Sequence, residues 1–162
     1  MAITKEKKQS IVASFSEIVA GAESIAFVQF DKLTVANAIA LRRQLRAAGV
    51  GYKVGKKTLL KRVLATHGYT GTLPELSGEI AIAYSTDALA PAREVYEFQK
   101  AHKDVITLVG GIFEGSYKSK EEIMTIATIP GLQTLRGMFV NIINSPIQRF
   151  VIALDQIAAK KA

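Results

Sequence analysis

The sequence predicts an α+β domain followed by a long amphipathic helix. Three observations lead to this class: several segments repeat apolar residues with helical spacing, short apolar or alternating runs separate those segments, and the pattern is wholly helical after residue 131. A chain of 162 residues is long enough for one domain of ordinary size with an appendage. Its 49% of apolar residues excludes a disordered chain.

Three helices and two strands are expected in the first 64 residues. Ile11, Phe15 and Ile18 follow the spacing of one helical face. A helix N-cap is expected at Thr34, and Gly49 can take the left-handed conformation that ends the helix between them. In chain order the expected elements are a helix over 5–20 capped by Thr4, a buried strand over 25–30, a helix over 35–48, a strand over 50–54 and a helix over 56–64.

A loop rich in Gly, Pro, Ser and Thr over 67–78 separates this part from further strands and helices. Asp87 is the expected N-cap of the next long helix, and Gly110-Gly111 marks a bulge or a close approach in a strand. Ser119 and Glu122 fit a capping box. The expected elements are a strand over 80–84, a helix over 87–101, a strand over 105–113 and a short helix over 119–127.

This order contains two strand–helix–strand units with an inserted helix between them. It predicts a ferredoxin-like two-layer α+β sheet, with an open doubly wound sheet as the alternative. We place the domain at 1–130 and a separate C-terminal helix at 131–162, after the hinge Ile129-Pro130-Gly131. Pro146 is expected to kink that helix. Its dense apolar face needs a cover, for which a partner helix is favoured over folding back on the sheet or lying on a membrane surface.

The net charge of +7 is unevenly distributed. Residues 1–62 carry 12 basic and 4 acidic side chains (net +8), residues 63–129 carry 5 and 9 (net −4), and residues 130–162 carry 4 and 1 (net +3). A surface without a polyanionic partner usually mixes the two signs. The segregation favours a first third that faces a polyanion, and a basic surface that only aids solubility is the alternative.

The strongest basic cluster lies in residues 53–62, where a strand is expected to lead into a helix. Helix N-termini favour phosphate groups, and flexible lysines reach phosphates without reading base identity. Beside this cluster only Tyr52 could stack on a base, so binding to the backbone of a folded RNA fits better than binding to unpaired bases. Charge alone does not distinguish RNA from DNA. The candidate RNA-binding residues are Lys7, Lys8, Arg42, Arg46, Lys53, Lys56, Lys57, Lys61 and Arg62.

Catalytic motifs are missing from the sequence, and we expect neither an enzyme nor a cofactor. The absence of Cys excludes disulfides, Cys-ligated zinc, iron–sulfur clusters and a cysteine nucleophile. The two histidines, His67 and His102, have no companion at metal-binding spacing. The Gly51–Thr58 loop matches neither the P-loop nor the dinucleotide-binding fingerprint, which argues against nucleotide binding. A nucleotide-dependent enzyme that uses this loop is the alternative function. No apolar run approaches ~18 residues and no signal segment is apparent, so a cytoplasmic location is expected.

Several segments resemble one known family. Val54–Arg62 is similar to the signature "V-x-K/R-N-T-L-L-x-R-A" of the large-subunit ribosomal protein ten family, with Lys57 in place of the family's Asn. Leu33-Thr34-Val35 and Leu41–Val50 match its "L-T-V … L-R-x-x-L-R-x-A-G-V". The resemblance extends in register over essentially the whole chain through Ile82–Ser85, Gly110–Gly115 and Ile126–Pro130. Two other departures are Lys32 for the usual Gly and Glu79 for the common Pro.

The resemblance implies a bacterial-type protein at the base of the ribosomal stalk. Its N-terminal domain would bind large-subunit ribosomal RNA beside another stalk-base protein. Its C-terminal helix would carry dimers of the acidic stalk protein, two rather than three, which recruit translational GTPases. It would also repress its own operon. A non-ribosomal assembly factor of the same fold is a further alternative. The candidate partner-binding residues are Leu135, Phe139, Ile142, Ile143, Ile147, Phe150, Val151, Leu154 and Ile157.

Overall fold

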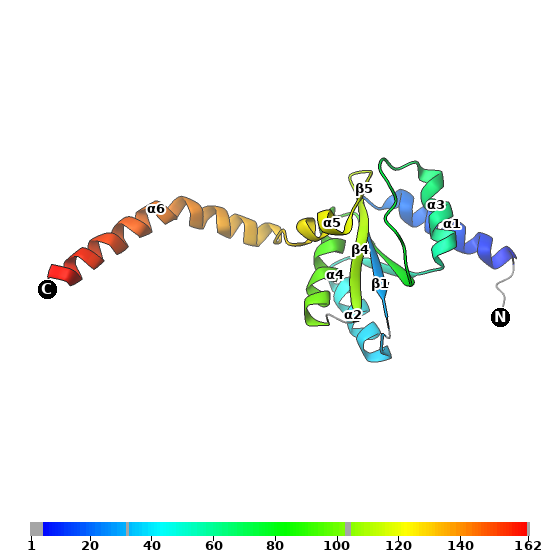
Figure 1. Cartoon of the computed structure of the whole chain (residues 1–162), viewed down its shortest axis with the longest axis horizontal. Coiled ribbons are helices and arrows are strands. Elements are labelled where there is room, and N and C mark those ends of the chain that lie inside the picture. The colour runs from blue at the N-terminus through cyan, green and yellow to red at the C-terminus, as the bar shows by residue number, and fades with distance from the viewer. Residues whose placement is uncertain (1–4, 32, 103–104, 162) are drawn as a thin grey trace. The chain divides into compact units, whose positions relative to one another are not determined.

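The computed structural model describes residues 5–31, 33–102 and 105–161. The chain divides into two compact units, Met1–Ile129 and Pro130–Ala162. The first unit holds a sheet with five helices, and the second is a single helix (Figure 1). The helices are α1 (Lys5–Gly21), α2 (Val35–Ala47), α3 (Lys57–His67), α4 (Ala90–Ala101), α5 (Lys120–Ala127) and α6 (Leu132–Lys161).

The sheet of the first unit is antiparallel throughout, with strand order β2-β3-β1-β4-β5. Its strands are β1 (Ser24–Phe30), β2 (Gly51–Val54), β3 (Glu79–Ser85), β4 (Ile106–Phe113) and β5 (Ser116–Lys118). β3 lies between β1 and β2, and β1 lies between β3 and β4, so the two strand–helix–strand units interleave. This is the split βαβ arrangement of ferredoxin-like domains, and it excludes the open doubly wound sheet.

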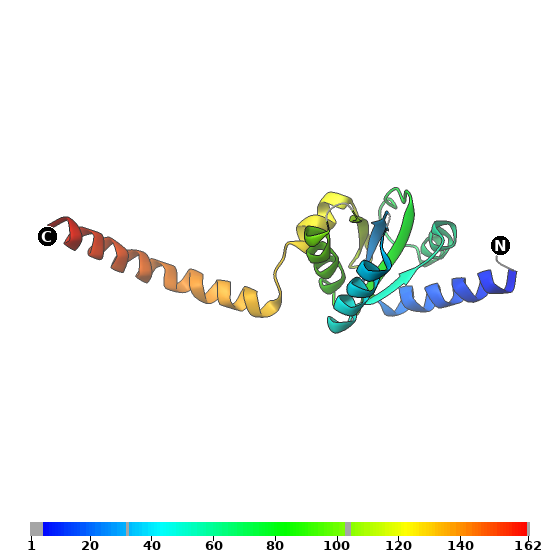
Figure 2. The ribbon, with the colours of Figure 1, turned by 90° about the horizontal axis from the view of Figure 1, so that it is seen from below.

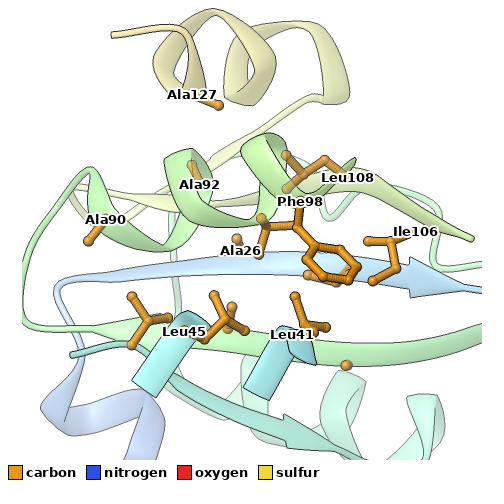
Figure 3. Packing of buried hydrophobic residues seen from close by; sticks show 14 of the residues in the cluster. Ala26, Leu41, Leu45, Ala90, Ala92, Phe98, Ile106, Leu108 and Ala127 are labelled. Atoms are coloured by element: carbon orange, nitrogen blue, oxygen red, sulfur yellow. The ribbon is translucent and has the colours of Figure 1, made fainter. Parts of the chain in front are cut away.

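Helices cover both faces of this sheet (Figure 2). On one face, α2, α4 and α5 pack over Ala26 and Val28 of β1; Figure 3 shows Leu41 and Leu45 of α2 within this cluster. On the other face, α1 and α3 pack over Ile25 and Phe27. Because successive strand residues point to opposite faces, the buried positions Ile25 to Val28 of β1 are all apolar, whereas the buried Ser24 donates a hydrogen bond to the Asp87 carbonyl. The ferredoxin-like layer pair is therefore extended by a third layer made of α1 and α3.

Most expected elements and caps are present. The Thr34 hydroxyl accepts a hydrogen bond from the backbone N–H of Asn37, and Ser119 and Glu122 form the capping box in both directions. The expected cap Thr4 lies outside the described residues. The prediction of Asp87 as an N-cap is wrong, since α4 begins three residues later and the Asp87 carboxylate instead accepts from the Leu89 backbone N–H at 3.1 Å. That bond closes a turn ahead of the helix.

The irregularity expected at Gly110-Gly111 is present, and it is followed by a strand that the periodicity missed. The pairing of β4 with β1 shifts so that Phe27 faces Gly110 and Val28 faces Leu108. After β4, Glu114 and Gly115 both have positive φ, at 49° and 73°, and return the chain into β5. Two left-handed residues in a two-residue loop fit the twist of a hairpin. Three residues are too few for an alternation to be recognised.

α6 continues as a helix through Pro146, and its ribbon bends near the middle in Figure 1, as a proline inside a helix predicts. Neither core cluster contains a residue of α6. It is also long and apolar enough to cross a membrane by length and composition, since an 18-residue window within it has a mean hydropathy of 1.2, although polar residues interrupt its apolar runs. Arg149 lies near its middle, where a charge would cost about 2.5–3.5 kcal/mol in a bilayer.

Candidate nucleic-acid interface and partner-binding helix

The turn from β2 into α3 exposes the central part of the predicted basic cluster. Lys56 occupies the N-cap position, and among the described residues no side chain caps the helix. The Leu59 N–H donates to the Lys56 carbonyl at 3.0 Å, and the preceding N–H groups of Lys57 and Thr58 can reach an outside acceptor next to the exposed side chains of Lys56 and Lys57. A cavity of about 570 Å³ lies at this turn, and its lining includes Lys56, Lys57 and Glu79. The site therefore offers backbone donors and two mobile cations to an anion.

Lys53, three residues earlier, has a different environment. Its ammonium donates a 2.7 Å hydrogen bond to the Ser14 hydroxyl and lies 5.1 Å from the centre of the Phe15 ring. Both partners belong to α1, and the Lys53 side chain is only partly exposed. The positive charge remains, but the structure gives it an internal partner that the sequence pattern did not indicate.

The α2 arginines form a second basic group on the opposite face of the sheet. Arg42 and Arg46 are exposed and line a cavity of about 390 Å³ at the start of β2, together with Tyr52 and Tyr84. Burial raises the pKa of Tyr52 to about 12, and the nearby charge of Arg42 acts in the opposite direction. The buried Tyr52 hydroxyl has no hydrogen-bond partner among the described residues. Arg43 lines an adjacent groove with Arg42 and Arg46.

A third basic group lies where α1 packs against α3. Lys8 and Arg62 line the same groove from the two helices, with a volume of about 490 Å³. Lys5 joins them from the first turn of α1. Lys7 and Lys61 are exposed on the same pair of helices. The structure therefore unites candidates that are more than fifty positions apart in sequence, which no local pattern could reveal.

Within the residues described, Arg93–Glu94 is the one ion pair, at 3.4 Å. None of the nine candidate cations has a carboxylate partner there. Lysines and arginines without intramolecular partners keep their full charge available for phosphates. The charge segregation noticed in the sequence thus corresponds to cations facing solvent from α1, α2 and α3.

The described residues contain no group of three His, Cys, Asp or Glu side chains that could hold a metal ion. His67 Nε2 lies 3.2 Å from the Ser16 hydroxyl and links the end of α3 to α1. His102 stacks on Phe98 with ring centres 4.4 Å apart. Both histidines are half-buried and contact neighbouring side chains.

The face of α6 predicted to bind a partner is exposed along its length. All nine candidate residues are exposed, with fractions between 38% and 70%. Eight of them form two series of alternating three- and four-residue steps, which is the spacing of a helix–helix seam, and Val151 belongs to neither series. The first series is Leu135, Phe139 and Ile142, and the second is Ile143, Ile147, Phe150, Leu154 and Ile157. The second series begins at Ile143, one residue or about 100° around the helix from Ile142, so the change of direction precedes Pro146.

The sequence of this chain is similar to that of one known protein family. A model of the family described as ribosomal protein L10 matches residues 3–100, more than half of the chain. The chain belongs to the ribosomal protein L10 family. Proteins named large ribosomal subunit protein uL10 from Shouchella clausii, Staphylococcus carnosus and Staphylococcus aureus are 36%, 33% and 34% identical to it. Each alignment covers 96% of this chain and 94% of the relative.

Membership of the L10 family makes the chain a ribosomal protein and confirms the resemblance found in its motifs. The family model ends inside α4, whereas the alignments with the bacterial relatives leave out only about 4% of the chain and so extend into α6. The similarity to these L10 relatives therefore includes most of the segment that forms α6.

Proposed function

We propose that this L10-family protein is a structural component of the large ribosomal subunit that connects ribosomal RNA to the stalk. In this proposal the unit Met1–Ile129 binds RNA at the stalk base, beside a neighbouring ribosomal protein. α6 anchors dimers of the acidic stalk protein, which recruit translational GTPases. The names of the bacterial relatives support the large subunit, and the ribosome of a bacterium lies in the cytoplasm. The observation that carries the RNA-binding role is the set of cations on α1, α2 and α3 that have no carboxylate partner among the described residues.

The proposed RNA contacts are chiefly to phosphates. Lys56 and Lys57 lie at an uncapped helix N-terminus, where backbone N–H groups add to their charges. Lys61 and Arg62 follow on the next turn of α3, and all four side chains are exposed. Contacts of this kind fix the orientation of a folded RNA without reading its sequence directly. They would also serve a folded leader of the protein's own messenger, which is the basis for proposed repression of its operon.

The proposed stalk attachment rests on α6. Its two apolar series meet at Ile142 and Ile143, which lie one residue or about 100° apart around the helix, so the two seams face different directions. One straight partner bundle cannot follow both seams, which favours two dimers, one on each half. Residues 130–162 carry 4 basic and 1 acidic side chain, and this net charge of +3 is complementary to an acidic partner.

A salt titration tests the RNA-binding half of the proposal. Removing one cation that neutralises a phosphate lowers the slope of log affinity against log salt concentration by roughly 0.7–0.9. We expect this change for Lys56→Gln, Lys57→Gln and Lys61→Gln with a stalk-base RNA fragment. Lys100→Gln is the matched control, because Lys100 lies on α4 with its ammonium 4.6 Å from the Tyr96 ring. Unchanged slopes in the three variants would refute the proposed phosphate binding by these lysines.

A deletion tests the stalk half. Removing residues 132–162 is expected to abolish binding of stalk-protein dimers and to preserve RNA binding, because both core clusters lie outside α6. Loss of both activities would mean that the helix supports the domain.

A binding role is favoured over the nucleotide-dependent enzyme. Within the Gly51–Thr58 loop, Gly55 is covered by the Phe15 ring, and Lys53 is bonded to Ser14, so the loop packs against α1. A P-loop instead wraps its backbone N–H groups around phosphates. Titration with ATP and GTP at physiological salt separates the two hypotheses, and we expect no saturable binding.

A further inference from the structure

The groove between α1 and α3 combines an apolar floor with a cationic rim. Val12 and Ala13 of α1 and Leu59 of α3 are its apolar residues, and Val12 and Leu59 are partly buried. Its volume of about 490 Å³ lies within the range of pockets that hold small organic groups. The groove is thus suited to a flat or apolar group rather than to an ion alone.

Among the described residues, the rim of this groove carries three cations and no carboxylate. Lys5 and Lys8 are three residues apart on α1, and Arg62 reaches the groove from α3. All three side chains are exposed, and none has an ion-pair partner within the described part of the chain. Gln9 also lines the groove, and its amide can both donate and accept hydrogen bonds.

We propose that this groove binds one unpaired nucleotide of the RNA, with its base on Val12 and Leu59 and its flanking phosphates on the rim. The inference rests on the proposed RNA-binding function and adds a base-contacting subsite to the phosphate contacts. Gln9 faces the edge of the base, and the planar guanidinium of Arg62 stacks on it or holds a phosphate. Unpaired bases that leave the stack are the usual targets of base-specific contacts to RNA.

Charge and position favour a nucleotide over an acidic protein segment. A docked helix needs apolar anchors repeated over several turns, whereas the apolar floor consists of Val12, Ala13 and Leu59. Ser16 also lines the groove, and its hydrogen bond to His67 ties α1 to α3. Lys61, adjacent to Arg62, is a proposed phosphate contact, so an RNA strand held there passes the groove.

Abasic scanning of the RNA tests this subsite. A stalk-base fragment of large-subunit ribosomal RNA is prepared with each unpaired nucleotide in turn replaced by an abasic one. For the unmodified protein, one position is expected to lose on the order of tenfold in affinity at constant salt, the size of a single base contact. Gln9→Ala and Leu59→Ala are expected to weaken binding of the intact fragment and to remove the penalty at that position. The salt slope stays the same, because both variants keep every cation that binds phosphate.

Two controls keep the result specific. Ser10→Ala changes an exposed residue of α1 whose hydroxyl donates to the Lys7 carbonyl and which does not line the groove, so its RNA affinity stays unchanged. Gln9 is exposed, so its replacement tests the proposal even if Leu59→Ala lowers stability. An abasic penalty that persists in both groove variants, or no penalty at any position, would overturn the subsite alone. Failure of the intact fragment to bind would overturn the proposed function as well, and loss of stalk-protein binding instead of RNA binding would assign the groove to a protein.

Discussion

The ammonium of Lys53 donates a 2.7 Å hydrogen bond to the hydroxyl of Ser14 and so joins the edge strand β2 to α1. The Phe15 ring next to Ser14 lies under the same ammonium and also covers Gly55, where any Cβ would collide with the ring. The edge strand and the loop after it therefore hold the helix that carries Lys5 and Lys8. Packing on one face of the sheet thus positions part of the proposed RNA surface.

Lys53→Met is expected to lower the free energy of unfolding by about 1–2 kcal/mol. The methionine keeps an apolar stem of similar length but removes a charged hydrogen bond and a cation–π contact. Urea unfolding followed by circular dichroism measures the change. The salt slope of RNA binding is expected to change by less than about 0.5, because the ammonium already has a partner.

Lys57→Met provides the contrast, since this exposed side chain has no internal partner in the described part of the chain. The free energy of unfolding of this variant is expected to stay within about 0.5 kcal/mol of that of the parent protein. The slope of log RNA affinity against log salt concentration is expected to fall by roughly 0.7–0.9. If Lys53→Met flattened the slope as much as Lys57→Met, a direct phosphate contact by Lys53, as the sequence predicts, would be supported instead.

Tyr52→Phe is expected to stabilise the domain by about 1 kcal/mol, because it removes a buried hydroxyl that lacks a partner among the described residues. The pKa of Tyr52 is raised to about 12, so the folded state holds this proton more tightly than the unfolded state, whose pKa is near 10. The contribution of this raised pKa to the free energy of unfolding is fully present below pH 10 and is lost as the pH rises towards 12. Thermal unfolding from pH 8 to 12 should therefore show a smaller alkaline loss in the variant.

The matched change Tyr69→Phe has the opposite expected sign. The Tyr69 hydroxyl donates to the Val19 carbonyl at 3.3 Å, and its removal should cost about 1 kcal/mol. Equal effects of the two substitutions would show that the Tyr52 hydroxyl is satisfied in solution.

Gly111→Ala is expected to destabilise the domain by roughly 1–3 kcal/mol, through overpacking of the core. A Cβ at this position would lie 2.5 Å from the Ile25 carbonyl oxygen and 2.9 Å from Ile123 Cδ1. Gly21→Ala serves as the control because no atom of the described residues lies within 4 Å of its added Cβ, and its stability should change by no more than about 0.5 kcal/mol. Chemical denaturation of the two variants compares them directly.

Phe150→Asp on α6 is expected to reduce the number of bound stalk dimers from two to one, as measured by native mass spectrometry. Phe150 is 65% exposed and lies in the second apolar series, beyond Pro146. A buried charge at a helix seam is costly, whereas the first series is untouched. Gln148→Asp introduces the same charge outside both series and should leave two dimers bound. Loss of both dimers from Phe150→Asp alone would mean that the halves act as one site.

Local sequence signals predicted the elements well wherever they were complete. The spacing of Ile11, Phe15 and Ile18 gave α1, and the Ser119–Glu122 capping box is present as expected. The misses arose where signals were short or ambiguous. β5 has three residues, and the Asp87 carboxylate caps a turn instead of the helix. Asp is suited to either position, so only the path of the chain could distinguish them.

The sequence alone determined the family and the order of strands and helices that a ferredoxin-like sheet requires. It also showed that a basic first third is separate from an apolar C-terminal helix. These properties depend on residue type and spacing along the chain. Only the tertiary structure decided which cations share a surface: it tied Lys53 to Ser14, placed Arg42 and Arg46 on the far face, and brought Lys8 beside Arg62. The physical reason is that helix packing over the two faces of the sheet joins residues distant in sequence, and no local periodicity records which face each helix covers.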